Sequence, residues 1–422
     1  MSEATMLLLR DGVDGEGARV DVRVDPGSGL VVEVGAALTP GDGDATLDCA
    51  GMVVLPAPAE PHAHLDKALS AGAAPNPAGD LRGAIDAWHA YRPSLDAEEI
   101  LGRAREAAHR FVAAGATAIR THLDVGPGIG LRGLDALVAL KRELAEQGLC
   151  DLQLVALISP PLTGPEGESN RMLLAAALEA GADVAGGCPH LDPDPVGATA
   201  VALDAAEAAG APVDLHSDET LDARRLAVRD LARMVVERGF VGGAVASHCV
   251  SLGAQRPALQ AIVARELADA GVAVVTCPQT NLYLQSRGVA QAPARGLTAV
   301  RALLDAGAIV AGGADNVGDP FNCVGRPDPL ETAALLVTAA HLTPAEAYTR
   351  VSGDARAALG LPAVALVPGA PAELLAVRGE SLADALARGS DHRFVIHRGR
   401  CVARTEVRTA LAPLSNVPAL MP

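Results

Sequence analysis

The chain lacks a long apolar run and a basic leader, and both absences bear on where it works. None of its 422 residues fall in a run of about 18 apolar residues, the length that marks a membrane-spanning helix. Its first residues, Met1-Ser2-Glu3-Ala4, have neither the basic start nor the long apolar segment of a secretory signal. We therefore expect a cytoplasmic protein with no membrane partner.

Positive charge is also scarce. The formal net charge is −17 at pH 7, without an acidic tail or block, and the only lysines are Lys67 and Lys141. A surface with this charge disfavours nucleic acid and anionic membranes as partners. A small neutral or cationic substrate remains compatible with it.

Paired-cysteine motifs are absent. The seven cysteines are scattered and odd in number, and no Cys-x-x-Cys occurs. Such motifs mark zinc knuckles, and an even set of cysteines marks a disulfide framework. The pattern predicts buried free thiols.

Short apolar runs at both ends of the chain predict a small β domain. Residues 1–55 and 366–422 alternate such runs with Gly, Pro and Asp clusters, as antiparallel strands joined by turns do. We expect the two ends to pair into one β-sandwich domain.

Between these ends, residues 56–365 alternate helices with buried strands. The predicted helices stop at Gly115, Gly148, Gly181 and Gly210, and an apolar run follows each stop. About eight such runs can be counted, at 52–55, 118–124, 152–158, 184–187, 212–217, 244–248, 272–277 and 309–314. Eight β/α units predict an α/β fold of the (β/α)8 TIM-barrel type, whose catalytic residues lie at the C-terminal ends of the strands.

A His-x-His pair, His62 and His64, follows the apolar run at 52–55. In an extended chain, residues two apart point to the same side, so both imidazoles can face one ion. Taken alone, the pair fits an ordinary loop as well as a metal site. Polar residues at the ends of three later strands favour the metal site, because all four strand ends share one rim. These residues are His216 with Glu219, His248, and Asp315.

These segments resemble the amidohydrolase superfamily and, within it, the cytosine deaminase branch and its N-isopropylammelide amidohydrolase relatives. The resemblance runs over nearly the full length of the chain. It rests on the segments 60–66, 119–125, 216–219, 246–248, 281–287 and 315–320.

The resemblance implies a barrel with a β domain from both termini and one divalent metal ion, Zn²⁺ or Fe²⁺, per chain. The expected metal ligands are His62, His64, His216 and Asp315, and the expected catalytic residues are Glu219, His248 and Asp315. Relatives with two metals commonly bridge them with a lysine at the end of strand four. No lysine follows Lys141, so one metal is expected.

The residue types suit this chemistry. Three neutral imidazoles and one carboxylate are ligands for Zn²⁺ or Fe²⁺, and bound Zn²⁺ lowers the pKa of water to about 7. Glu219 would move the water's proton to a ring nitrogen, His248 would orient the hydroxide, and Asp315 would pass a proton to the leaving amine. The other zinc deaminase class is excluded, because its Pro-Cys-x-x-Cys motif is missing.

Five residues are candidate substrate contacts: Ser159, Gln285, Asn316, Trp88 and His122. Ser159 lies near the position where cytosine deaminases are expected to carry a glutamine, and a hydroxyl cannot make the paired contacts of an amide. Asn316 replaces an aspartate that follows the metal ligand in those enzymes. Trp88 also suits helix packing, and His122 equally suits a hydrogen bond behind the ligands.

Lys67 is a further departure from the cytosine deaminase pattern. A lysine at this position is seen among relatives that act on triazines and other nitrogen heterocycles. An ordinary surface lysine is the equally good alternative.

The sequence therefore predicts a metal-dependent hydrolytic deaminase. Its substrate would be a small nitrogen heterocycle, such as a cytosine-like or modified pyrimidine, a triazine or a creatinine-like ring. Hydrolysis of a cyclic amide C–N bond is the alternative reaction, and a catalytically inactive ligand-binding barrel is a third hypothesis that the intact ligand set disfavours. A barrel of this size is compatible with a homo-oligomer, and no sequence feature specifies a symmetry.

Overall fold

Eight parallel strands form one of the two sheets of the computed structural model, which describes residues 5–411. They follow one another around the sheet in chain order. The strands are β6 (Glu60–Ala63), β7 (Ala118–Val125), β8 (Asp151–Ile158), β9 (Val184–Gly187), β10 (Val213–Ser217), β11 (Ala244–His248), β12 (Val272–Thr276) and β13 (Val310–Gly312). The predicted (β/α)8 barrel is confirmed.

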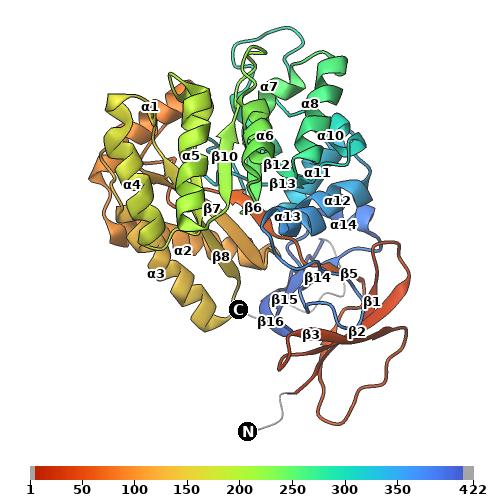
Figure 1. The fold of residues 1–422 in the computed structure, drawn as a ribbon. Helices are drawn as coiled ribbons and strands as arrows, with labels where there is room; N and C mark the ends of the chain where they lie inside the picture. The colour runs from red at the N-terminus through yellow and green to blue at the C-terminus, as the bar shows by residue number, and fades with distance from the viewer. Residues whose placement is uncertain (1–4, 412–422) are drawn as a thin grey trace.

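Helices surround this barrel, and the terminal sheet lies beside it, at the bottom of the view in Figure 1. The α-helices are α1 (Leu81–Tyr91), α2 (Ala97–Ala113), α3 (Arg132–Gln147), α4 (Glu168–Glu179), α5 (Pro195–Ala209), α6 (Ala227–Arg238), α7 (Val250–Gly253), α8 (Pro257–Asp269), α9 (Pro278–Leu284), α10 (Val300–Asp305), α11 (Pro329–Ala340), α12 (Pro344–Val351), α13 (Gly353–Ala358) and α14 (Leu382–Arg388). Short 3-10 helices are η1 (Arg92–Ser94), η2 (Pro165–Gly167) and η3 (Pro189–Leu191).

Helix α3 illustrates how the sequence builds these elements. Its leucines at positions 134, 137, 140 and 144 recur at helical spacing and are buried on the barrel side. Gly148 ends the helix in the left-handed conformation, with φ of 64°, which glycine adopts without a steric penalty. The predicted stop at Gly148 is therefore correct.

Strands from both ends of the chain form a second sheet. Its N-terminal strands are β1 (Leu7–Val13), β2 (Arg19–Asp25), β3 (Leu30–Gly35), β4 (Ala45–Asp48) and β5 (Met52–Pro56), and its C-terminal strands are β14 (Leu374–Arg378), β15 (Arg393–His397) and β16 (Arg400–Thr405). All are hydrogen-bonded into one sheet, and strands from both ends contribute to one apolar core. The two ends thus pair as predicted, through β14 against β5.

The assignment of 52–55 as the first barrel strand is wrong. This run is β5 of the terminal sheet, and the first barrel strand is the short β6. The reason lies in its burial: Val53 and Leu55 pack into the barrel core, whereas Met52 and Val54 pack into the core of the β domain. A strand buried on both faces has the continuous apolar pattern of a barrel strand.

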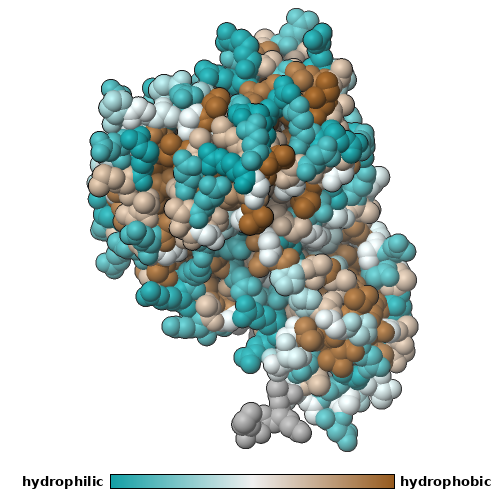
Figure 2. Space-filling model, viewed as in Figure 1, coloured by the Kyte–Doolittle hydropathy of each residue, from teal (hydrophilic) through white to brown (hydrophobic). Residues whose placement is uncertain are grey.

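Two further expectations concern the surface. No helix between residues 5 and 411 is long and apolar enough to cross a bilayer. Figure 2 shows polar side chains over much of the visible face, with apolar ones scattered between them.

The cysteines are free, but Cys323 and Cys401 are exposed, so the prediction of buried thiols fails at these two. The expected lack of a signal at Met1–Ala4 falls outside the described residues.

Candidate metal and catalytic site

The four predicted ligands converge at the C-terminal ends of three strands. His62 lies on β6 and His64 follows it, while His216 lies on β10 and Asp315 follows β13. Oδ1 of Asp315 is 3.6 Å from Nε2 of His62 and 3.3 Å from Nε2 of His64. Nε2 of His64 is 3.2 Å from Nε2 of His216. The four side chains therefore surround one small space.

The donor atoms of this group fit a cation. Nε2 of His62 and both carboxylate oxygens of Asp315 are buried and have no hydrogen-bond partner among the described residues. Buried polar atoms are rarely left without a partner, because each loses its hydration. Burial also lowers the pKa of His62, His64 and His216, which favours the neutral imidazole that binds metal. A divalent cation would satisfy all of these atoms.

Hydrogen bonds behind the ligands fix the orientation of two imidazoles. Nδ1 of His62 is 2.8 Å from the Ser247 hydroxyl, which donates to Asp214 at 3.1 Å. Nδ1 of His64 is 3.0 Å from the carbonyl oxygen of His122. Nζ of Lys67 also lies 3.2 Å from Nδ1 of His64, a longer contact than the one to the carbonyl oxygen. With the proton on Nδ1 directed to the Ser247 and His122 oxygens, each ring presents the lone pair of Nε2 to the shared space, as metal-binding histidines commonly do.

Two residues of the same rim have a left-handed backbone conformation. His248, the last residue of β11, has φ of 69°, and Asp315 has φ of 68°. A non-glycine residue in this left-handed region costs about 1–3 kcal/mol, and such residues cluster at functional sites. In this backbone conformation, both side chains point toward the ligand group.

Glu219 and His248, the predicted catalytic pair, are close together. Oε1 of Glu219 lies 3.7 Å from Nδ1 of His248, and the Asn281 amide nitrogen lies 3.4 Å and 3.2 Å from these two atoms. Burial raises the pKa of Glu219 to about 8 and lowers that of His248 to about 3. Asn281 was not among the predicted site residues, although it begins the segment 281–287 on which part of the resemblance rests.

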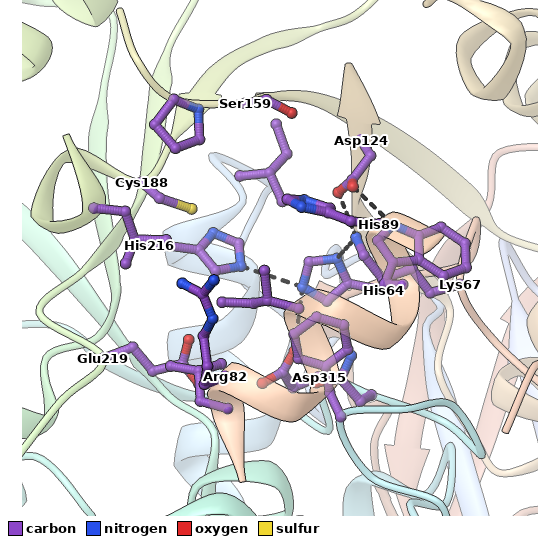
Figure 3. Close-up of a pocket in the computed structure, with 18 of the residues that line it drawn as sticks. His64, Lys67, Arg82, His89, Asp124, Ser159, Cys188, His216, Glu219 and Asp315 are labelled. Atoms are coloured by element: carbon purple, nitrogen blue, oxygen red, sulfur yellow. Dashed lines mark hydrogen bonds and ion pairs between the residues drawn. The ribbon is translucent and has the colours of Figure 1, made fainter. Parts of the chain in front are cut away.

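A cavity of about 410 Å³ opens above this group (Figure 3). The predicted site residues that line it are His64, His216, Asp315, Glu219, His248, Ser159, Asn316 and Trp88. Its volume is in the range of about 300–1,000 Å³ that is usual for small-molecule sites.

One wall of the cavity is built around Asp124. Its carboxylate accepts hydrogen bonds from Lys67 at 2.6 Å, from the Trp88 indole at 2.7 Å and from Arg92 at 3.0 Å. Burial alone would raise the pKa of Asp124, but Lys67 and Arg92 lower it to about 2. Lys67 is thus a buried cavity residue and not a surface lysine. Neither Asp124 nor Arg92 was among the predicted site residues.

Ser159 and Asn316, the other two departures from the cytosine deaminase pattern, also face the cavity. The Ser159 hydroxyl lies 3.4 Å from Arg92, and the Asn316 amide donates to Asp319 at 2.9 Å. Asn316 is therefore held by a carboxylate three residues ahead of it.

Two predicted substrate contacts do not line the cavity. His122 lies below the ligands, with its ring centroid 3.9 Å from that of His62, because its side chain points into the barrel interior. Gln285 follows α9, and its side chain lies against Gly296 and not in the cavity. His122 contributes its carbonyl oxygen instead, to His64.

A family model, described as the amidohydrolase family, matches residues 76–403. The chain belongs to the amidohydrolase family. It is therefore a hydrolase that acts on C–N bonds, and the resemblance drawn from its motifs is confirmed.

Individual relatives agree with this assignment. The chain is 30% identical to a pterin deaminase from Rhizobium rhizogenes over 358 residues, which is 84% of this chain and 81% of the relative. It superimposes on 5-methylcytosine deaminase from Klebsiella pneumoniae, liganded with 5-fluorocytosine, with a TM-score of 0.85 and 29% identity over 97% of this chain and 100% of that one. For N-isopropylammelide isopropylaminohydrolase from Burkholderia multivorans, the TM-score is 0.82, with 30% identity over 95% and 98%.

We predict that Asp124→Asn destabilises the protein, because it leaves Lys67 and Arg92 buried without their carboxylate. Removing one partner of a buried ion pair costs about 3–5 kcal/mol. Asp86→Asn is the matched control: its partner Arg82 is exposed, and such pairs contribute less than about 1 kcal/mol. Urea denaturation of both variants measures the difference, and equal losses would contradict the assigned role of Asp124.

Proposed function

We propose that this chain is a deaminase with one divalent metal, Zn²⁺ or Fe²⁺, that hydrolyses an amino or alkylamino group from a small nitrogen heterocycle. The observation that carries the proposal is the placement of Glu219 and His248 beside the three histidines and Asp315, at the floor of a cavity that all of them except His62 line. The deaminase relatives, which match over most of the chain, support it.

The four ligands would hold the cation. When bound, it would lower the pKa of water, so that hydroxide is available to attack a ring carbon at neutral pH. Glu219 is the proton carrier of the proposal. Its carboxyl faces the cavity from a buried position, and its raised pKa lets it hold a proton near neutrality. We assign it the transfer of a proton from the attacking water to a ring nitrogen of the substrate.

His248 and Asp315 would complete the proton transfers. Nε2 of His248 is buried without a partner among the described residues, so it is free to orient the attacking oxygen. Oδ2 of Asp315 is 3.9 Å from Nδ1 of His248, within the same group. Asp315 would take the remaining proton of the attacking oxygen and pass it to the amino group as the C–N bond breaks, so that the amine leaves as the neutral molecule.

The proposed substrate is a mono- or bicyclic ring that carries an exocyclic amine. Related proteins are a pterin deaminase and a 5-methylcytosine deaminase, and the cavity has room for rings of either size. Ser159 and Arg92 lie together in the wall and both offer hydrogen-bond donors. This wall favours a substrate edge with acceptor atoms, such as a ring oxygen substituent or an unprotonated ring nitrogen.

An assay of amine release tests the proposed reaction. The zinc- or iron-loaded protein is incubated with pterin, 5-methylcytosine, cytosine and N-isopropylammelide, and ammonia or isopropylamine is measured. We expect release of the amine from at least one of them, with the ring intact. A ring-opened product without any amine would contradict deamination and support cyclic amide hydrolysis.

Glu219→Gln tests the assigned proton carrier. The amide keeps the shape of the side chain but cannot carry the proton, so kcat is expected to fall by about 10²–10⁴-fold while bound metal is unchanged. Glu237→Gln, at an exposed ion pair with Arg233, is the control and should retain full activity. Wild-type turnover by the Glu219→Gln variant would refute the role.

Metal removal tests the cation. We expect the chelated protein to lose activity and to regain it with one equivalent of Zn²⁺ or Fe²⁺ per chain, because one set of four ligands is present at the cavity floor. Metal analysis by mass spectrometry and activity are measured on the same samples. Full activity of a metal-free sample, or a requirement for two equivalents, would contradict the proposal.

A further inference from the structure

The barrel closes between β6 and β13, where few backbone hydrogen bonds join the strands. Within the described residues, a single bridge pairs Ala63 with Asp315, and the Asp315 N–H donates to the His62 carbonyl at 2.8 Å. By contrast, β7 and β8 pair along their whole length. Two of the proposed metal ligands, His62 and Asp315, therefore lie on opposite sides of a junction without a strand ladder.

The Glu60 side chain spans this junction. It is 1% exposed, and its Oε1 accepts a hydrogen bond from the His62 N–H at 2.9 Å. The Ala314 N–H donates to Oε1 at 3.1 Å and to Oε2 at 3.0 Å. The Glu60 carboxylate thus replaces the missing strand ladder. It binds the backbone N–H of the ligand His62 and that of Ala314, which precedes the ligand Asp315.

Because Gly313 has no side chain, there is room for the Glu60 carboxylate. A Cβ atom at Gly313 would lie 2.9 Å from Oε1 of Glu60 and 3.1 Å from Cβ of His62. At the adjacent Gly312, a Cβ would instead meet the helix side chains of Leu336 at 3.0 Å and Thr332 at 3.2 Å. The two glycines are neighbours in sequence, but only Gly313 faces the carboxylate.

We infer that Glu60 is a positioning residue for the metal site, whose carboxylate holds His62 and Asp315 at the separation that one cation requires. It does not line the cavity, so it acts through the ligands and not on the substrate. The inference rests on the proposed function, because it takes these two residues as metal ligands.

Glu60→Gln provides the test. Glutamine keeps the length of the side chain and one acceptor oxygen, but its NH₂ group cannot accept from the Ala314 N–H. We expect the affinity for Zn²⁺, measured by competition with a chelator, to fall by about 10–100-fold, as is typical when a partner behind a metal ligand is lost. Thermal unfolding of the metal-free proteins reports separately on stability.

Asp21→Asn is the matched control. Asp21 is also 1% exposed, and its carboxylate accepts from the N–H groups of Asp11 and Leu38, both at 2.7 Å, in the β domain away from the ligands. This variant should lose thermal stability but keep the wild-type affinity for Zn²⁺.

Gly313→Ala keeps the test open if Glu60→Gln does not fold, with Gly312→Ala as its control. Weaker Zn²⁺ binding by Glu60→Gln or Gly313→Ala, but not by the controls, supports the inference. Wild-type affinity in Glu60→Gln overturns the inference alone. A wild-type protein that binds no Zn²⁺ overturns the proposed function, and the inference with it.

Discussion

The approach of His62 to Asp315 across the closure of the barrel is the constraint on which the site depends. The two residues come from the first and last barrel strands, so the ligand group exists only when the barrel is complete. The closed arrangement leaves buried nitrogen and oxygen atoms without partners and places two residues in the left-handed region. Each feature costs free energy in the folded protein, and cation binding would recover part of that cost.

The floor and the wall of the cavity differ in how their buried carboxylates are paired. On the floor, neutral imidazoles and Asp315 gather, and neither carboxylate oxygen has a hydrogen-bond partner within residues 5–411, which leaves room for an external cation. In the wall, the Asp124 carboxylate accepts hydrogen bonds from Lys67, Trp88 and Arg92, so it is already paired with two buried cations. This difference is the basis for the proposal that chemistry takes place at the floor and substrate recognition at the wall.

The sequence predicted the floor well, because its residues sit at strand ends where a fixed backbone direction decides where a side chain points. His62, His64 and His216 needed only the strand period and the barrel topology to be placed together. The first barrel strand was missed, since β6 is short and carries Glu60 and His62 in place of an apolar run. Its neighbour β5 resembled a barrel strand because both of its faces are buried.

The wall and the junction could not be predicted, because they depend on contacts between distant segments. Asp124 meets side chains from α1 and η1, and Glu60 meets the backbone after β13, and no local pattern encodes either contact. Gln285 and Asn281 share one motif, but Asn281 contacts Glu219 and His248, whereas Gln285 lies against Gly296. Local rules thus placed the strand ends, and tertiary packing selected among the remaining candidates.

The most direct test of one cation held by these four residues is anomalous X-ray diffraction at the zinc edge from crystals of the zinc-loaded protein. The account predicts a single strong peak per chain, about 2.0–2.2 Å from Nε2 of His62, His64 and His216 and from a carboxylate oxygen of Asp315. Two peaks would contradict it. So would a peak among His62, His122 and Asp214, whose ligand atoms also lie within 4.8 Å of one another.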